Sequence, residues 1–366
     1  MKKVVSSFTP FRTNLMIAMI GVTFLCGCGG QQRREASRIQ SLLDESDLLI
    51  EARDYNLAKE KGQKAIIDVS KLLEKHPDQI EYLLLRSRAA MVVFMAKNAI
   101  ILQSAKPQPQ SLVALPAKDA YIDYDKDVKM ALNDVKVVLG KEDSLSLEQK
   151  AASYATLATI YRLDALTMQD AYDAYGKAVN TNLKWKEELR DKIAKGRNTN
   201  APISMTTLDK EIKQLMLSRI EVTLALKNWQ KALDLLESNM AKKDLKYFDA
   251  QMQILENNIA DTQRKLESDF QKEASSKKDK ISQQIEEMKK IQAQKDPSQL
   301  HAIGNYTNYE VALMDLELEL TYIKNNLIYR MICYHNLNMQ EEFTEASTIL
   351  SKYSPVKAKE IVKALK

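Results

Sequence analysis

Few residues of this chain have the type and spacing that chemistry requires. The three histidines, His76, His301 and His335, lie far apart, and none belongs to an H-E-x-x-H pair that would hold zinc on one helical face. His76 precedes a proline at a predicted helix end, where a cation favours the helix dipole, so a capping role is favoured over catalysis. The glycine-rich phosphate-binding motifs and the G-x-S-x-G motif do not occur. We therefore predict that the protein is not an enzyme and has no catalytic, cofactor-binding or metal-ligating residues.

Three aspartates, Asp123, Asp125 and Asp127, have the spacing with which an EF-hand calcium loop opens. The rest of that loop is missing from the sequence. Val128 stands where the sharp turn needs glycine, and Asp134 stands where the bidentate glutamate belongs. We expect these carboxylates to lie on a solvated helix face and to bind no calcium.

The N-terminal segment carries the most specific pattern of the chain. Three basic residues precede an apolar run, residues 15–24, which ends in Leu25-Cys26-Gly27-Cys28. Ten residues are fewer than the roughly 20 that a membrane-spanning helix needs, so the run is typical of a signal-peptide core. The tetrad resembles the lipobox of bacterial lipoproteins. This resemblance implies cleavage after residue 27 and lipid attachment at Cys28, the mature N-terminus.

The same resemblance implies how the chain is attached to its membrane. Residues 28–37 are mostly polar and charged and are expected to form a lipid-anchored tether. Gly29, in place of aspartate, follows the modified cysteine, which in the lipoprotein family favours the outer membrane, facing the periplasm, if the organism is diderm. A plain signal peptide or a short anchor helix is the alternative interpretation.

Composition restricts the partners and the fold. Cleavage would remove three cations and no acid, lowering the net charge from +5 to +2, so no strong basic field is left to attract nucleic acid. Cys333 would then lack a disulfide partner, and burial must hold the fold together. Glycine is scarce while helix-forming residues dominate, and apolar residues recur at spacings of three and four. We predict an all-α fold.

Helix boundaries follow from capping residues and prolines. Asp78 with Glu81 and Ser146 with Gln149 are both predicted capping boxes. The segment 106–118 contains three prolines and is the best candidate for an internal domain boundary. The predicted helices lie at 38–52, 55–75, 78–105 (apolar nearly all round and therefore central), 248–294 and 306–337.

The predicted organisation has three parts after the tether. Residues 38–243 form a helical-repeat array, and residues 244–296 form a long helix with a heptad-like apolar seam. This helix projects in part from the array, because residues 271–280 contain almost nothing to bury. Residues 297–366 then supply an antiparallel return helix and a final hairpin.

Parts of the array resemble tetratricopeptide repeats, although the units are separated by insertions and lack the family's first-helix glycine. Another helical-hairpin array is the alternative. The residues that carry the resemblance are Tyr154, Leu157, Ala158, Tyr161, Ala171, Tyr175, Ala178, Trp229, Ala232, Leu327, Met331, Tyr334, Phe343, Ala346 and Pro355.

The two resemblances together imply a membrane-anchored scaffold in the bacterial cell envelope, which binds another envelope protein or peptide during outer-membrane assembly, secretion or pilus biogenesis. A transporter-associated solute-binding lipoprotein is the alternative, and an envelope hydrolase ranks last. Charge reversal at the arginine or the glutamate of the implied groove is expected to weaken partner binding without changing thermal stability. The residues that the repeat resemblance places in this concave groove are Thr159, Arg162, Gln214, Glu221, Asn325 and His335.

Overall fold

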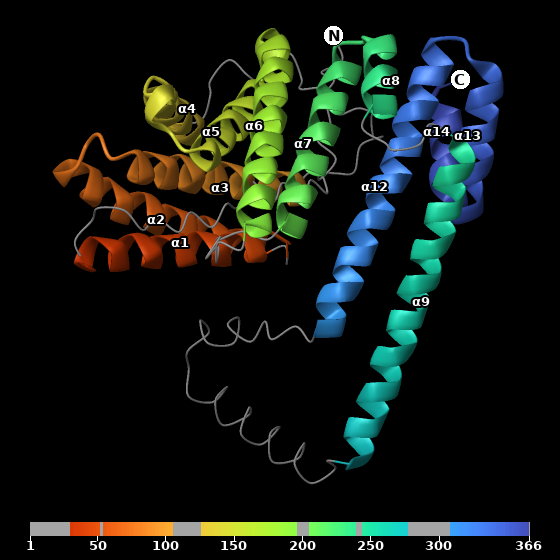
Figure 1. The fold of residues 1–366 in the computed structure, drawn as a ribbon, viewed down its shortest axis with the longest axis horizontal. Coiled ribbons are helices and arrows are strands. Elements are labelled where there is room, and N and C mark those ends of the chain that lie inside the picture. Colours follow the sequence, from red (N-terminus) through yellow and green to blue (C-terminus); the bar gives the residue numbers. More distant parts are fainter. Residues whose placement is uncertain are drawn as a thin grey trace. The chain divides into compact units, whose positions relative to one another are not determined.

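All secondary structure in the described residues is helical, which confirms the all-α prediction (Figure 1). The computed structural model describes residues 30–51, 54–104, 126–195, 205–238, 244–276 and 308–365. Within these residues no helix combines the length and the apolar character that crossing a membrane would require. Cys28 and the rest of the lipobox lie outside the described residues.

The chain divides into two compact units, Met1–Ala232 and Leu233–Lys366. The division lies within helix α8 (Trp229–Ser238), not at the proline-rich segment 106–118. The helices on either side of that segment pack against each other, so the predicted boundary there is wrong.

Unit 1 is a succession of helices in which each one packs against the next along the chain. The first helix begins at Gly30, eight residues before the predicted start, so residues 30–37 of the expected tether are helical. The helices are α1 (Gly30–Glu51), α2 (Tyr55–Lys75), α3 (Ile80–Ser104), α4 (Lys126–Leu139), α5 (Leu147–Tyr161), α6 (Met168–Ala194) and α7 (Met205–Ala225).

Helix α3 is the centre of this unit, as its apolar sequence predicts, and it contacts α1, α2, α4 and α5. Its apolar residues join three core clusters. One is shared with α1 and α2, a second with α4 and α5, and a third, smaller one again with α1 and α2. The approach of α2 is especially close at the buried Gly62. A β-carbon added there would lie 2.8 Å from Cγ2 of Val93 and 3.2 Å from Cγ1 of Val92. Glycine at this position therefore allows the two helices to pack in contact.

Charged side chains of α3 are neutralised inside the unit. Arg86 binds Asp134 through two parallel hydrogen bonds of 2.8 and 2.7 Å. Asp134 is fully buried and Asp127, which pairs with Lys97, is 8% exposed. The expectation of a solvated face for these two aspartates is therefore wrong, because each neutralises a cation of α3. Asp123 and Asp125 lie outside the described residues.

The predicted capping boxes have different outcomes. The backbone amide of Gln149 donates to the Ser146 hydroxyl while the Gln149 side chain accepts from the Ser146 amide, which confirms that box at the start of α5. The Asp78 box is wrong, because α3 begins only at Ile80. The Asp78 side chain instead accepts a hydrogen bond from Lys141 at 3.2 Å.

Unit 2 is built on two long antiparallel helices, α9 (Leu245–Ser276) and α12 (Asn308–Asn336). Their pairing confirms the predicted return helix, while the rest of the predicted 248–294 helix falls outside the described residues. Helices α13 (Gln340–Tyr353) and α14 (Pro355–Leu365) follow, with Pro355 at the first helical position as predicted.

The core of unit 2 contains a buried arginine. Arg330 is fully buried on α12 and its guanidinium lies 4.8 Å from the ring centre of Phe248 on α9. It donates to the side-chain oxygens of Asn326 and Tyr334, each at 3.1 Å. Within the described residues no carboxylate lies at ion-pair distance from Arg330, so the aromatic ring and these two neutral oxygens offset the cost of burying its charge.

Candidate functional site

The predicted groove residues are distributed over both units. Thr159, at the end of α5, and Gln214, on α7, are partly buried in unit 1. Asn325 and His335 lie on α12 in unit 2, where His335 is exposed and its ring centre is 5.9 Å from that of Phe343. The remaining two residues, Arg162 and Glu221, are brought into direct contact.

Arg162 and Glu221 form an ion pair between α5 and α7. Arg162 Nη2 lies 2.6 Å from Glu221 Oε2, and the two side chains are only 15% and 14% exposed. Burial lowers the pKa of Arg162, but the charges of Glu221 and Tyr175 and their hydrogen bonds raise it by more, so the net pKa lies above the ordinary arginine value. The pair therefore joins two helices and is already satisfied within the fold.

A second pair of ionisable side chains also lies on α5 and α7, but it consists of two carboxyl groups and contains no cation. Glu211 on α7 is 4% exposed, and neither of its carboxylate oxygens has a hydrogen-bond partner in the described structure. Burial raises its pKa to about 8, assisted by the negative charge of Glu148 on α5. Burial likewise raises the pKa of Glu148 to about 7. Glu211 therefore favours the protonated form at neutral pH, because ionisation would place unpaired charge inside the protein, while Glu148 is divided between its two forms.

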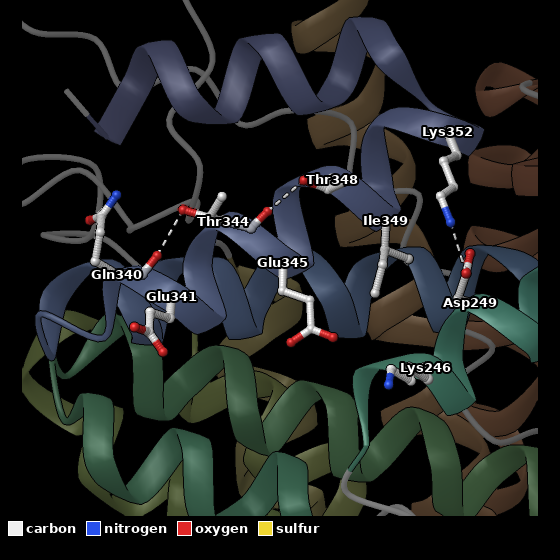
Figure 2. Close-up of a pocket in the computed structure, with 9 residues that line it drawn as sticks. All are labelled: Lys246, Asp249, Gln340, Glu341, Thr344, Glu345, Thr348, Ile349 and Lys352. Atoms are coloured by element: carbon white, nitrogen blue, oxygen red, sulfur yellow. Dashed lines mark hydrogen bonds and ion pairs between the residues drawn. The ribbon is translucent and has the colours of Figure 1, made fainter.

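A groove lies in unit 2, between α13 and the first turn of α9 (Figure 2). We call it the α9–α13 groove. Its volume is about 650 Å³. Its lining residues come from every turn of α13 and from one turn of α9: Lys246, Asp249, Gln340, Glu341, Thr344, Glu345, Thr348, Ile349 and Lys352.

The α13 wall of the groove carries threonine hydroxyls, and these already donate hydrogen bonds to backbone carbonyls of the same helix. Thr344 donates to the carbonyl of Gln340 and Thr348 donates to the carbonyl of Thr344, each at 2.8 Å. These bonds leave the threonine methyl groups and the Ile349 side chain as the apolar part of the lining. Glu341 and Glu345 stand one helical turn apart and are exposed.

One end of the groove is closed by a contact between α9 and the end of α13. Lys352 Nζ lies 2.9 Å from a carboxylate oxygen of Asp249, and the Tyr353 hydroxyl donates to the other oxygen, also at 2.9 Å. The hydrogen bond from Lys352 is the largest cause that lowers the pKa of Asp249, and Tyr353 adds to it. Asp249 is therefore ionised at neutral pH and fully compensated by its neighbours.

Metal and thiol chemistry have no evident site in these helices. Among the described residues no three His, Cys, Asp or Glu side chains gather in a way that would hold a metal ion. Cys333 is a buried free thiol whose pKa is raised to about 12 by burial, so it stays protonated and unreactive.

Sequence reasoning missed the α9–α13 groove. The signal was present as a polar stripe at spacings of four along residues 340–352, on the face opposite the buried Ala346 and Leu350. A stripe of this kind is normally read as a solvated surface. It becomes a groove only because the start of α9, about 100 residues earlier, lies beside it.

Comparison of this chain with protein-family models, with curated protein sequences and with solved structures finds no match.

Proposed function

We propose that this protein is a membrane-anchored scaffold lipoprotein of the bacterial cell envelope, which binds another protein or peptide through helical hairpins of the tetratricopeptide type. The observation that carries the proposal is the α9–α13 groove, an open channel that follows α13 along its length.

The open shape of the groove favours a peptide over a small solute. Ligand pockets for small molecules are concave and enclose most of the ligand's surface. This groove is open along one helix and bears five charged side chains among its nine lining residues. From Gln340 to Lys352 it runs for about 18 Å at 1.5 Å per residue, the length of roughly three turns of a partner helix.

The consecutive packing of helices in unit 1 also supports the proposal. An array in which each helix contacts the next presents side chains of several hairpins on one surface, and such arrays bind extended or helical segments without chemistry. The residues implied by the repeat resemblance belong to this proposal unit by unit, four in unit 1 and two on α12 in unit 2, with one restriction. Arg162 and Glu221 bind each other, so their contribution to partner binding is limited by the free energy needed to separate them.

The envelope location rests on Leu25-Cys26-Gly27-Cys28. Lipidation of Cys28 with two or three acyl chains would hold the protein at the membrane, since a single chain gives only marginal binding. The variant Cys28→Ser should release the protein from membranes or leave it as an unprocessed precursor. Wild-type protein that incorporates no labelled fatty acid would contradict this part of the proposal.

Site-specific photocrosslinking in intact cells tests the binding function. A benzophenone amino acid at Thr348 or Gln340 should capture a defined protein, which mass spectrometry identifies. The same probe at Ile67, a 56% exposed residue of α2, serves as the control. If neither groove position gives an adduct that is absent from the Ile67 control, the groove is not a binding site.

A further inference from the structure

We propose that the segment bound in the α9–α13 groove is cationic, with two lysine or arginine residues one helical turn apart that contact Glu341 and Glu345. This inference rests on the proposed function, because it names the chemistry of the partner for the same site.

The charge balance within the groove carries the inference. Asp249 is compensated by Lys352 and Tyr353, so neither it nor Lys352 is available to a partner. Among the described residues Glu341 and Glu345 form no ion pair, and Lys246 is the remaining cation of the lining. Within the described helices the α13 wall is therefore left with two unpaired negative charges against the one unpaired cation on α9, a net charge of −1 for the groove.

The helix dipole favours an acidic residue in the first turn of α13, but it does not account for Glu345. Glu341 lies in the first turn of α13, where a negative charge is stabilised by the helix dipole. Glu345 lies one turn further on, beyond the range of that effect, and it repels Glu341 across the i, i+4 spacing. A cation placed between or opposite the two carboxylates would remove this repulsion.

The spacing of the two carboxylates matches a helical partner. Residues four apart on a helix are separated by about 6 Å along its axis, so basic residues at i and i+4 of a partner meet both glutamates at once. The apolar stems of lysine or arginine can lie on Ile349 and the threonine methyl groups. Lys246, on the opposite wall, repels basic residues and so directs them towards α13.

The test compares two matched double variants, each carrying the photocrosslinker at Thr348. Glu341→Gln with Glu345→Gln removes both charges from the groove. Asp170→Asn with Asp173→Asn removes two exposed charges one turn apart on α6, which form no ion pair within the described residues. Both pairs are exposed and each begins in the first turn of its helix, so the thermal unfolding midpoints of the two variants should shift by similar small amounts.

We expect the groove variant to lower the crosslinking yield about fivefold and the α6 variant to leave it unchanged. The two exposed ion pairs that are lost are worth about 0.5 kcal/mol each, and about 1 kcal/mol in total corresponds to a fivefold change. In permeabilised cells the wild-type yield should fall as salt is raised, because exposed charges are screened. Sequencing the crosslinked peptide should reveal basic residues three or four apart.

The outcomes separate this inference from the proposed function. An adduct whose yield is the same in the groove variant and insensitive to salt, or a captured segment that is acidic or uncharged, overturns the cationic partner but keeps the groove as a binding site. The absence of any Thr348 adduct in the wild type overturns the binding function, and this inference with it.

Discussion

Arg162 of α5 and Glu221 of α7 are 59 residues apart in the sequence, yet their side chains meet at 2.6 Å with less than a sixth of either exposed to solvent. Sequence analysis expected both on the surface of a groove, where charge reversal would spare stability. Their burial changes that expectation, because removing one partner leaves the other charge uncompensated.

We therefore predict that Arg162→Glu lowers the free energy of unfolding by about 3–5 kcal/mol, the usual cost of breaking a buried pair. Chemical denaturation followed by circular dichroism measures this. The exchanged variant Arg162→Glu with Glu221→Arg should recover part of the loss. Equal stability of wild type and Arg162→Glu would show that the pair is solvated in solution.

The buried carboxyls Glu148 and Glu211 should make the protein less stable at alkaline pH. Their folded-state pKa values of about 7 and about 8 exceed the ordinary value of 4.5, so the folded state binds protons more tightly than the unfolded state. The stabilisation is complete below about pH 4.5 and is lost as the pH rises through 7 and 8. Urea unfolding at a series of pH values should show a fall of about 1–3 kcal/mol between pH 5 and pH 8.

The variant Glu211→Gln isolates this effect. It removes the ionisable group while keeping a side chain of similar volume, so the decline between pH 5 and pH 8 should shrink and stability at pH 8 should rise relative to wild type. A control is Asp170→Asn on the exposed face of α6, which should leave the slope unchanged. If the stability of Glu211→Gln still falls by the same amount between pH 5 and pH 8, groups other than Glu211 cause the fall.

Gly62→Ala should destabilise unit 1 although alanine is the better helix former. The added methyl group would lie 2.8 Å from Val93 Cγ2, and a β-branched side chain on a packed helix has no alternative rotamer to adopt. We expect a net loss of about 1–2 kcal/mol after the helix-propensity gain of about 1 kcal/mol. Thermal and chemical denaturation report it.

Gly176→Ala is the matched comparison. There the new methyl group meets the end of the Arg219 side chain, at 2.8 Å from Nη2, which can move at the cost of its stacking on Tyr172. The loss should be smaller than at Gly62. A larger loss at Gly176 would mean that the Arg219 stacking, and not the α2–α3 approach, is the tighter constraint.

Hydrogen exchange should be faster in the second half of α9 than in α3. The buried residues of α9 with described side chains end at Leu255, whereas the helix continues to Ser276. A helix with little buried surface opens locally at low cost, while the α3 amides between Leu83 and Val93 lie in the core. Equal protection of residues 259–276 and of α3 would show that this part of α9 is covered in solution.

Local patterns predicted much of the helix content, because apolar spacing and capping residues act within a few residues of each other. The range 55–75 and the Ser146 capping box are examples. The sequence could not reveal that Arg330, Asp134 or Glu211 would be buried, since charged residues are normally exposed and nothing local marks the exceptions. The Asp78 capping box failed for a different reason, because α3 begins only at Ile80 and the exposed Asp78 side chain instead contacts Lys141, 63 residues away.

The candidate site was less predictable than the fold. A groove needs two walls, and the walls of the α9–α13 groove come from segments about 100 residues apart. The polar stripe of α13 predicts one wall, but the placement of Lys246 and Asp249 depends on how α9 pairs with α12 and α13, which the spacing of residues within one helix does not encode.

The pairing of α9 with α12 also has a consequence for synthesis of the chain. Glu256 of α9 contacts Lys324 of α12 across 68 residues, so at 5–20 residues per second the ribosome needs about 3–14 s to supply the partner of a completed α9. During that interval the apolar side chains of Phe248, Met252 and Leu255 have no α12 to cover them. In unit 1 each helix packs against the next one to be synthesised, so its apolar face is covered early. Helix α9 instead exposes its apolar side chains until α12 has been made, which gives a chaperone that binds nascent chains a longer time to act on it.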